Sequence, residues 1–168
     1  MTSGEAKLDL ETIFAAQYER IARIIARVIR DRARAEELAV EVFLKWSRNP
    51  RAHGASAEGW LYRAAVRVSL DELRSQTRRS RYEPLLALLR PAPTPEEIHS
   101  SRQERDRVRM VLAVLPPRQA ELLLLRFDDL SYEELASVLE LNPASVGTLL
   151  SRAQQAFRKE YVKRYGEQ

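Results

Sequence analysis

The residues of this chain best suited to bind another molecule are four arginines and a tryptophan in one predicted helix. At about 100° per residue, the arginines fall within about 60° of one another, and Trp60 lies at the edge of their sector. An indole face can stack on an unpaired base, and guanidinium groups can contact phosphates. The pattern predicts a surface for single-stranded nucleic acid, made by Trp60 and an arginine row of Arg63, Arg67, Arg74 and Arg78.

The arginine row has an alternative interpretation. Leu70 lies within the same sector and interrupts the row. A solvated arginine face, with Trp60 packed into the core, fits the same pattern. The sequence pattern therefore leaves both interpretations open.

Residues 130–159 predict two helices joined by a tight turn. Ser131 and Glu134 can form a capping box, which starts one helix. Asn142 and Pro143 are a helix cap and a first-turn proline, so a second helix starts about one turn after the first ends. This layout is typical of a DNA-reading helix-turn-helix, although an ordinary helical hairpin is the alternative. The residues predicted to face outward from the second helix are Ala144, Ser145, Gly147, Thr148, Ser151, Arg152 and Gln155.

A third candidate surface lies on the predicted helix that ends near Asn49. Its core stripe is predicted to consist of Ala35, Leu38, Ala39, Val42, Phe43 and Trp46. That assignment leaves acidic and apolar side chains outside, namely Glu36, Glu37, Val40, Glu41 and Leu44. Such a face suits a protein partner, and a solvated acidic face fits the pattern too.

The sequence contains no recognisable catalytic or metal-binding constellation. It has no cysteine and no glycine-rich phosphate loop, and its two histidines, His53 and His99, lie far apart and are predicted to be surface residues. We therefore predict no enzyme activity, no metal and no cofactor. No apolar run is long enough for a signal peptide or a membrane span, which favours a bacterial-type cytoplasmic protein without membrane insertion.

The elements that position these surfaces are all predicted to be helices. The first three helices cover about 10–30, 35–48 and 57–79, and the third is predicted to bury Leu61, Ala64, Ala65 and Val68. A proline-rich stretch follows, and helix resumes with a capping box at Thr94. The predicted fold is all-α, with two small helical domains at 1–80 and 96–168 and a linker at 81–95.

Charge is unevenly distributed along the chain. The net charge is +4, and most of the basic residues are arginines, which suit phosphate contacts. Residues 1–80 carry 15 Lys or Arg against 11 Asp or Glu, whereas residues 116–168 carry 7 against 8. The N-terminal half must therefore contribute to any binding of nucleic acid.

Three segments, in order and spacing, resemble the extracytoplasmic-function (group IV) sigma factors of bacterial RNA polymerase. RARAEELAVEVFLKW at 32–46 is similar to sigma region 2.2, WLYRAAVRVSLDELR at 60–74 to regions 2.3 and 2.4, and LPPRQAELLLLRFDDLSYEELA at 115–136 to region 4. The resemblance implies that the first domain binds the β′ clamp helices of core RNA polymerase and captures the minus-ten strand. It also implies that the second domain binds the β flap and reads the minus-35 promoter DNA, and that an anti-sigma factor is a partner.

The resemblance gives a role to each candidate surface. Polymerase contact is implied for Glu37, Val40, Glu41 and Leu44. The minus-ten strand is implied to meet Trp60 and the arginine row, together with the loop from Asn49 to Ser56. The outward residues from Ala144 to Gln155 are implied to meet the minus-35 duplex, with Arg152 as the main cation.

This sequence departs from the family pattern at several of these positions. Glu37 and Val40 stand where Asp and Gln are usual, and Gly147 and Leu149 where Lys and Arg are common. Glu140 replaces the glycine of the turn. Two alternatives follow: a sigma-like protein that binds polymerase without reading DNA, and a stand-alone helix-turn-helix regulator. The near-neutral second domain argues against the stand-alone regulator.

Overall fold

The computed structural model describes residues 3–55, 57–80 and 100–167. Within these ranges the chain forms seven α-helices and one short 3-10 helix, and no strand is present. The predicted all-α fold class is therefore confirmed. The proposed linker at 81–95 and the capping box at Thr94 lie outside the described residues, and the domain boundaries stay a prediction.

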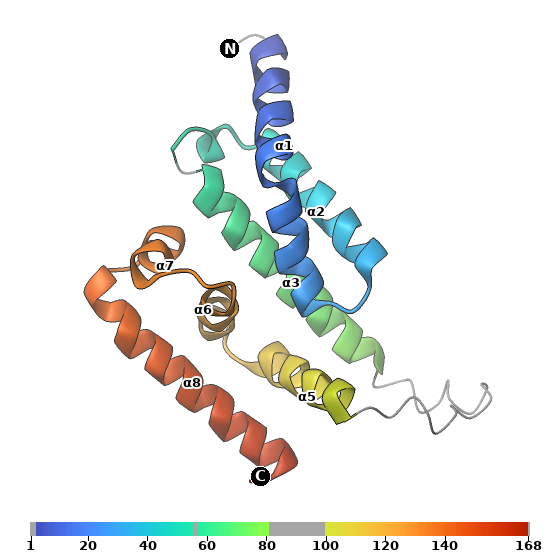
Figure 1. Cartoon of the computed structure of the whole chain (residues 1–168), viewed down its shortest axis with the longest axis vertical. Coiled ribbons are helices and arrows are strands. Elements are labelled where there is room, and N and C mark those ends of the chain that lie inside the picture. The colour runs from blue at the N-terminus through green and yellow to red at the C-terminus, as the bar shows by residue number, and fades with distance from the viewer. Residues whose placement is uncertain (1–2, 56, 81–99, 168) are drawn as a thin grey trace, which may run out of the picture.

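The N-terminal part is a bundle of three helices in mutual contact, α1 (Ser3–Val28), α2 (Arg32–Ser47) and α3 (Ala57–Ser80) (Figure 1). A 3-10 helix, η1 (Pro50–Ala52), joins α2 to α3. The Asp31 carboxylate caps α2 by accepting from the Arg34 backbone N–H at 3.0 Å. The core stripe predicted for this helix is confirmed, since the buried residues of α2 are Ala35, Leu38, Ala39, Val42, Phe43 and Trp46.

The C-terminal part has four helices, α5 (Ser100–Val114), α6 (Pro117–Phe127), α7 (Tyr132–Leu139) and α8 (Pro143–Tyr165). The predicted capping box is confirmed: Glu134 N–H donates to Ser131 Oγ at 3.1 Å, and Ser131 N–H donates to the Glu134 carboxylate at 2.7 Å. The Asn142 cap is confirmed as well, because its side-chain oxygen accepts from Ala144 N–H at 3.0 Å. Both helices therefore begin where the cap residues predicted.

Helix α3 lies in the middle of the molecule. It contacts α1 and α2, and it also contacts α5, α6 and α7 (Figure 1). The buried apolar side chains of the N-terminal and C-terminal helices form one hydrophobic cluster that runs through both parts. The C-terminal helices therefore pack directly on the bundle, with α3 as their main contact.

Because α3 packs against helices of both parts, its buried residues differ from the sequence prediction. Leu61 and Ala65 are buried as predicted, whereas Ala64 and Val68 are only half-buried. The helix also buries five apolar residues that the single-stripe prediction omitted, Ala57, Tyr62, Val66, Leu70 and Leu73. A helix covered by other helices on more than one side buries a wider sector than one amphipathic stripe.

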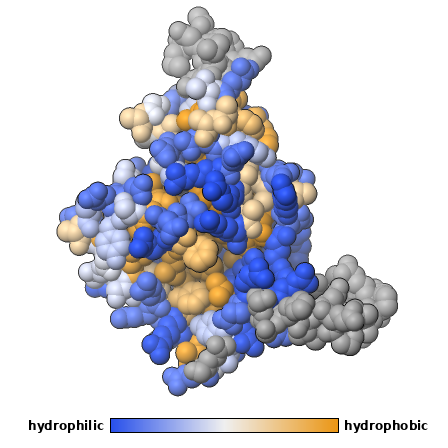
Figure 2. Space-filling view, in the orientation of Figure 1, coloured by the Kyte–Doolittle hydropathy of each residue, from blue (hydrophilic) through white to orange (hydrophobic). Residues whose placement is uncertain are grey.

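On the face shown in Figure 2 the surface is mostly polar, and one of its apolar areas lies between α5 and α8. A groove in this part of the molecule lies between the end of α1 and helices α5, α6 and α8, and its walls include Leu112, Leu123 and Phe157. Among the described helices, none combines the length and the apolar character that crossing a membrane requires.

Candidate nucleic-acid interfaces

Helices α7 and α8 meet in a turn with the geometry of a helix-turn-helix. Glu140 occupies the left-handed region, with φ 55° and ψ 48°, and ends α7. The turn is closed by the Leu141 N–H, which donates to the Ala136 carbonyl at 2.8 Å. Arg118 of α6 donates to the Leu139 carbonyl at 2.7 Å, which satisfies one of the last carbonyls of α7. Glu140 therefore takes the backbone conformation that usually favours glycine.

The face of α8 that was predicted to read duplex DNA is accessible. Val146, Leu150 and Ala153 are buried against the other helices. Ser145 and Gly147 are half-buried. The remaining predicted residues are exposed, and they are Ala144, Thr148, Ser151, Arg152 and Gln155. Contact of this face with DNA stays a prediction.

Gly147 has a neighbour that the sequence did not reveal. A Cβ added at this position would lie 3.5 Å from the ring of Tyr132, which is an ordinary van der Waals contact. The Tyr132 ring is 49% exposed and lies under the Arg126 guanidinium, 5.7 Å from the ring centroid. The structure therefore places an aromatic and a cation beside the first turns of α8. Neither residue was among those predicted for the minus-35 surface.

The arginine row of α3 points largely at the C-terminal helices. Arg63 donates to the Val138 carbonyl of α7, and its guanidinium lies 3.9 Å from the Glu140 carboxylate. Arg67 Nε lies 3.2 Å from the carboxylate of Glu121, a residue of α6. Three of the four predicted arginines thus contact protein, because the third, Arg74, donates to the carbonyls of Ala113 at 3.1 Å and Leu115 at 3.4 Å.

The other members of the predicted single-strand surface differ from these three arginines. Arg78 is exposed near the end of α3. Trp60 is half-buried and packs against the hydrophobic core. Leu70, which interrupts the row, is only 2% exposed, so the side of α3 that carries the row is covered at that point. The role of this surface in binding a DNA strand stays a prediction, and Arg63, Arg67 and Arg74 would have to exchange their present protein contacts for phosphates.

Arginines of α1, and Arg30 just after it, make a second set of contacts with the C-terminal part. Arg27 donates to the Asp128 carboxylate at 2.6 Å, and Arg20 lies 3.9 Å from the same side chain. Arg30 lies 2.8 Å from the carboxylate of Asp106 in α5. The sequence pattern predicted no partner for these arginines. The one signal that could have revealed their partners is the contrast in charge between the basic N-terminal half and the acidic residues further along the chain.

Burial changes the acid–base properties of two residues near this contact. Burial raises the pKa of Tyr62, and its hydrogen bond to the Glu58 carboxylate, at 2.8 Å, adds to the effect. Burial lowers the pKa of Arg109, whose guanidinium donates to the Val28 carbonyl at the end of α1 at 2.7 Å. Tyr62 therefore stays protonated and hydrogen-bonded, and Arg109 ties α5 to α1.

The loop between α2 and α3 is held by core contacts. The Trp46 indole N–H donates to the Ala52 carbonyl at 3.0 Å. The ring of His53 lies 4.3 Å from the Trp46 ring, and its Nε2 lies 3.0 Å from the Trp46 carbonyl. His53 is half-buried, so the prediction of a surface histidine is wrong at this position, because the ring covers Trp46. His99 lies outside the described residues.

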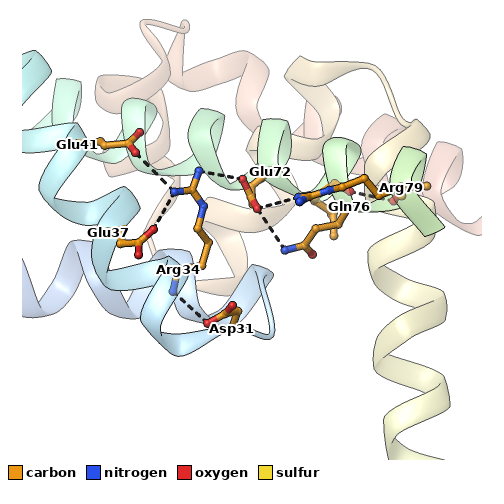
Figure 3. A network of polar contacts seen from close by, with 9 residues as sticks. Asp31, Arg34, Glu37, Glu41, Glu72, Gln76 and Arg79 are labelled. Carbon is orange, nitrogen blue, oxygen red and sulfur yellow. Dashed lines mark hydrogen bonds and ion pairs between the residues drawn. The ribbon is translucent and has the colours of Figure 1, made fainter. Parts of the chain in front are cut away.

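The predicted protein-binding face of α2 is exposed. Val40 and Leu44 are 40% and 43% exposed, so two aliphatic side chains of this face are in contact with solvent. Glu37 and Glu41 lie on the same face and contact Arg34 at 2.9 Å and 3.6 Å (Figure 3). The acidic and apolar side chains therefore remain available to a partner, and their role in polymerase binding stays a prediction.

Arg34 also joins this face of α2 to α3. Its guanidinium lies 3.3 Å from the Glu72 carboxylate, which in turn contacts Arg79 at 3.3 Å (Figure 3). Hydrogen bonds to Glu37 and then to Glu72 raise the pKa of Arg34. The network joins the first turn of α2 to the C-terminal half of α3.

The caps, the turn and the exposed face of α8 define a helical protein with a helix-turn-helix. Two comparisons with protein families then identify its class. Residues 13–79 match the family described as Sigma-70 region 2, and residues 105–156 match Sigma-70, region 4. Among the residues that the structure describes, no group of three or more His, Asp or Glu side chains could hold a metal ion.

Curated relatives have the same class of name. The probable RNA polymerase sigma factor RfaY of Xanthomonas campestris is 31% identical over 165 residues, which cover 91% of this chain and 40% of the relative. The extracytoplasmic-function sigma factor SigE of Mycolicibacterium smegmatis is 31% identical, with 89% and 60% covered. The sigma factor YlaC of Bacillus subtilis is 28% identical, with 92% of each chain covered. The chain thus spans 40% and 60% of the length of the first two relatives.

A solved structure shows a weaker likeness. It is the sigma factor RpoE of Bartonella quintana in complex with the anti-sigma factor NepR, with a TM-score of 0.49 and 15% identity over 90% of this chain and 96% of that chain.

The two regional matches and the curated relatives together show that this chain belongs to the sigma-70 family, in its extracytoplasmic-function type.

Proposed function

We propose that this protein binds core RNA polymerase and directs it to a set of promoters. In this proposal α2 binds the β′ clamp helices through Glu37, Val40, Glu41 and Leu44. Trp60 and the arginine row hold the opened minus-ten strand, and α8 reads the minus-35 duplex. The protein acts in the cytoplasm as an initiation factor and not as an enzyme, and an anti-sigma factor controls it.

The observation that carries the proposal is the order of the two sigma regions along one chain. A region 2 match precedes a region 4 match, and each coincides with a surface of suitable chemistry. The exposed α8 face follows a properly capped helix-turn-helix. The exposed aliphatic residues of α2 offer a contact for a large protein partner.

The charge distribution weighs against a stand-alone helix-turn-helix regulator. Such a protein should concentrate its positive charge near the reading helix. Here residues 116–168 carry 7 basic against 8 acidic residues, so duplex binding by this part alone should be weak. A partner that supplies further DNA contacts, as core polymerase would, can compensate for weak duplex binding by this part.

Transcription from a promoter library tests the proposal. The purified protein is mixed with core RNA polymerase and a library of promoter fragments, and the transcripts are sequenced. We expect starts at a small set of related sites that are absent when core polymerase is used alone. Polymerase binding without specific starts would instead support a sigma-like interaction protein. Binding to duplex DNA with no polymerase association would contradict the proposal.

A further inference from the structure

Arg34 contacts three carboxylates that come from two helices. Its guanidinium lies 2.9 Å from the Glu37 carboxylate and 3.6 Å from the Glu41 carboxylate, both on α2, and 3.3 Å from the Glu72 carboxylate on α3 (Figure 3). Glu37 and Glu41 belong to the exposed face of α2 that is proposed to bind polymerase. One side chain therefore connects this face to the neighbouring helix.

Glu72 is the least exposed of the three carboxylates. Its side chain is 12% exposed, and its carboxylate also contacts Arg79 at 3.3 Å and Gln76 at 3.5 Å (Figure 3). Donors that compensate the charge of a nearly buried carboxylate hold it in place. The side chains of Glu37 and Glu41 are 64% and 47% exposed, and among the described residues Arg34 is the one cation that pairs with either of them. Arg34 thus joins two exposed carboxylates to one fixed carboxylate.

Arg34 lies at the edge of the α2 face that adjoins α3. At about 100° per residue, the apolar pair of this face lies on one side of Glu37, whereas Glu41 and Arg34 lie on the other side. Glu37 and Glu41 each direct one oxygen toward Arg34, and a carboxylate has about four acceptor positions, so both keep acceptors for a partner. The guanidinium can therefore hold the carboxylates without covering the apolar side chains.

The two glutamates would be less well ordered without Arg34. Glu37 and Glu41 are four positions apart on α2, and like charges at this spacing repel one another. Long exposed side chains also lose rotamer freedom when a partner binds, which weakens binding. A guanidinium in contact with both carboxylates reduces the repulsion and restricts their rotamers before the partner arrives. The acidic side of the face is thereby preorganised.

We propose that Arg34, held by Glu72, is a positioning residue for the polymerase-binding face of α2. It acts through the carboxylates of Glu37 and Glu41 and need not contact polymerase itself. This inference rests on the proposed function. The partner surface that fits the face has cationic donors beside an apolar contact, because the face itself has carboxylates beside aliphatic side chains.

The sign of the effect of Arg34→Gln tests the inference. If Arg34 only screened the carboxylates, its removal would strengthen binding to a cationic surface. If Arg34 positions them, binding weakens. We expect the dissociation constant of the complex with core RNA polymerase to rise roughly three- to tenfold, measured by fluorescence anisotropy of N-terminally labelled protein. Tighter or unchanged binding would overturn the inference.

Arg32→Gln is the matched control. It makes the same change in net charge in the same turn of α2, and it removes an ion pair of 3.2 Å with Glu36, which is not among the residues proposed to bind polymerase. We expect it to change the dissociation constant by less than about twofold. A loss of affinity equal to that of Arg34→Gln would overturn the inference, because any change of charge near the start of α2 would then suffice.

A double-mutant cycle separates positioning from a general effect on the fold. When Glu37→Gln and Glu41→Gln are already present, Arg34→Gln should not change the dissociation constant further, because no carboxylate of the face remains to be held. The same fold-change in both backgrounds would overturn the inference, since Arg34 would then act on the fold or contact polymerase directly. Circular dichroism verifies that each variant is folded.

Two further variants test how Arg34 is held. Glu72→Gln should weaken polymerase binding in the same direction, and unchanged binding would overturn the role of Glu72. Arg34→Lys keeps the charge but replaces the planar fork by a single ammonium, so its affinity should lie between those of wild type and Arg34→Gln. Failure of the wild-type protein to bind core polymerase would instead contradict the proposed function.

Discussion

Trp60 could serve either of the two roles considered for the α3 surface, stacking on a base or packing in the core. It is half-buried, so part of its indole packs against the core while part remains accessible. A base could stack on the accessible part, and the neighbouring Arg63 could contact a phosphate if it gave up the Val138 carbonyl. The same indole also adds apolar contacts to the core.

Trp60→Ala should impair promoter opening and leave polymerase binding intact. Stacking of a base on an aromatic ring contributes about 1–3 kcal/mol, so open-complex formation should fall roughly 5- to 150-fold. Trp60→Phe keeps an aromatic face and should retain most of the activity. Permanganate footprinting of the opened strand and a pull-down of core polymerase measure the two properties separately. Equal loss of both properties would mean that Trp60 acts only as a core residue.

Gly147 is a second residue with a measurable effect. An alanine Cβ would contact the Tyr132 ring at 3.5 Å without a clash. Because glycine destabilises a helix interior by about 1 kcal/mol relative to alanine, Gly147→Ala should raise the free energy of unfolding by up to that amount. Urea denaturation followed by circular dichroism measures the change. A decrease in stability would mean that the Tyr132 ring cannot accommodate a methyl group.

At the scale of elements, local residue types predicted the helices and their starts well. Ser131, Glu134, Asn142 and Pro143 gave the starts of α7 and α8, because capping is a local interaction between neighbouring residues. The core stripe of α2 followed from helical periodicity. The exposed face of α8 also follows from periodicity once the start of that helix is known.

The partners of the arginine row could not be predicted in the same way. Periodicity placed Arg63, Arg67 and Arg74 on one side of α3, but it does not say what covers that side. The carbonyls and the carboxylate that they contact lie at least 39 positions along the chain. Leu70 was the one local sign, because a leucine within a solvated arginine row is unusual, and its burial is explained by the packing of α3 in the middle of the molecule.

The turn between α7 and α8 carries backbone strain at Glu140. A non-glycine residue in the left-handed region costs roughly 1–2 kcal/mol, while glycine loses about 0.5–1 kcal/mol more entropy on folding. Glu140→Gly should therefore raise the free energy of unfolding by up to about 1 kcal/mol and the Tm by about 2–4 °C. Differential scanning calorimetry measures both quantities. Glu133→Gly, at a helical position of α7, is the control and should lower stability.

At the scale of the whole molecule, the distribution of charge matches the packing. Basic side chains of α1, of the turn after it and of α3 meet acidic side chains of α5, α6 and the turn after α6, in pairs such as Arg30 with Asp106 and Arg67 with Glu121. The near-neutral C-terminal part is therefore a partner for the basic N-terminal part as well as a proposed DNA reader. Long-range attraction between the two parts supports the packed arrangement at low salt.

The continuous hydrophobic cluster predicts cooperative unfolding of the wild-type protein. Two independent domains on a tether would unfold in separate steps, whereas parts that share one core should unfold together. We expect one calorimetric transition whose van't Hoff enthalpy equals the calorimetric enthalpy. Leu70→Asp places a charge at a 2% exposed position of α3 and should split or broaden this transition as the C-terminal helices separate. Leu44→Asp, the same substitution at a 43% exposed position of α2, should keep one transition. Two wild-type transitions would show that the two parts unfold independently.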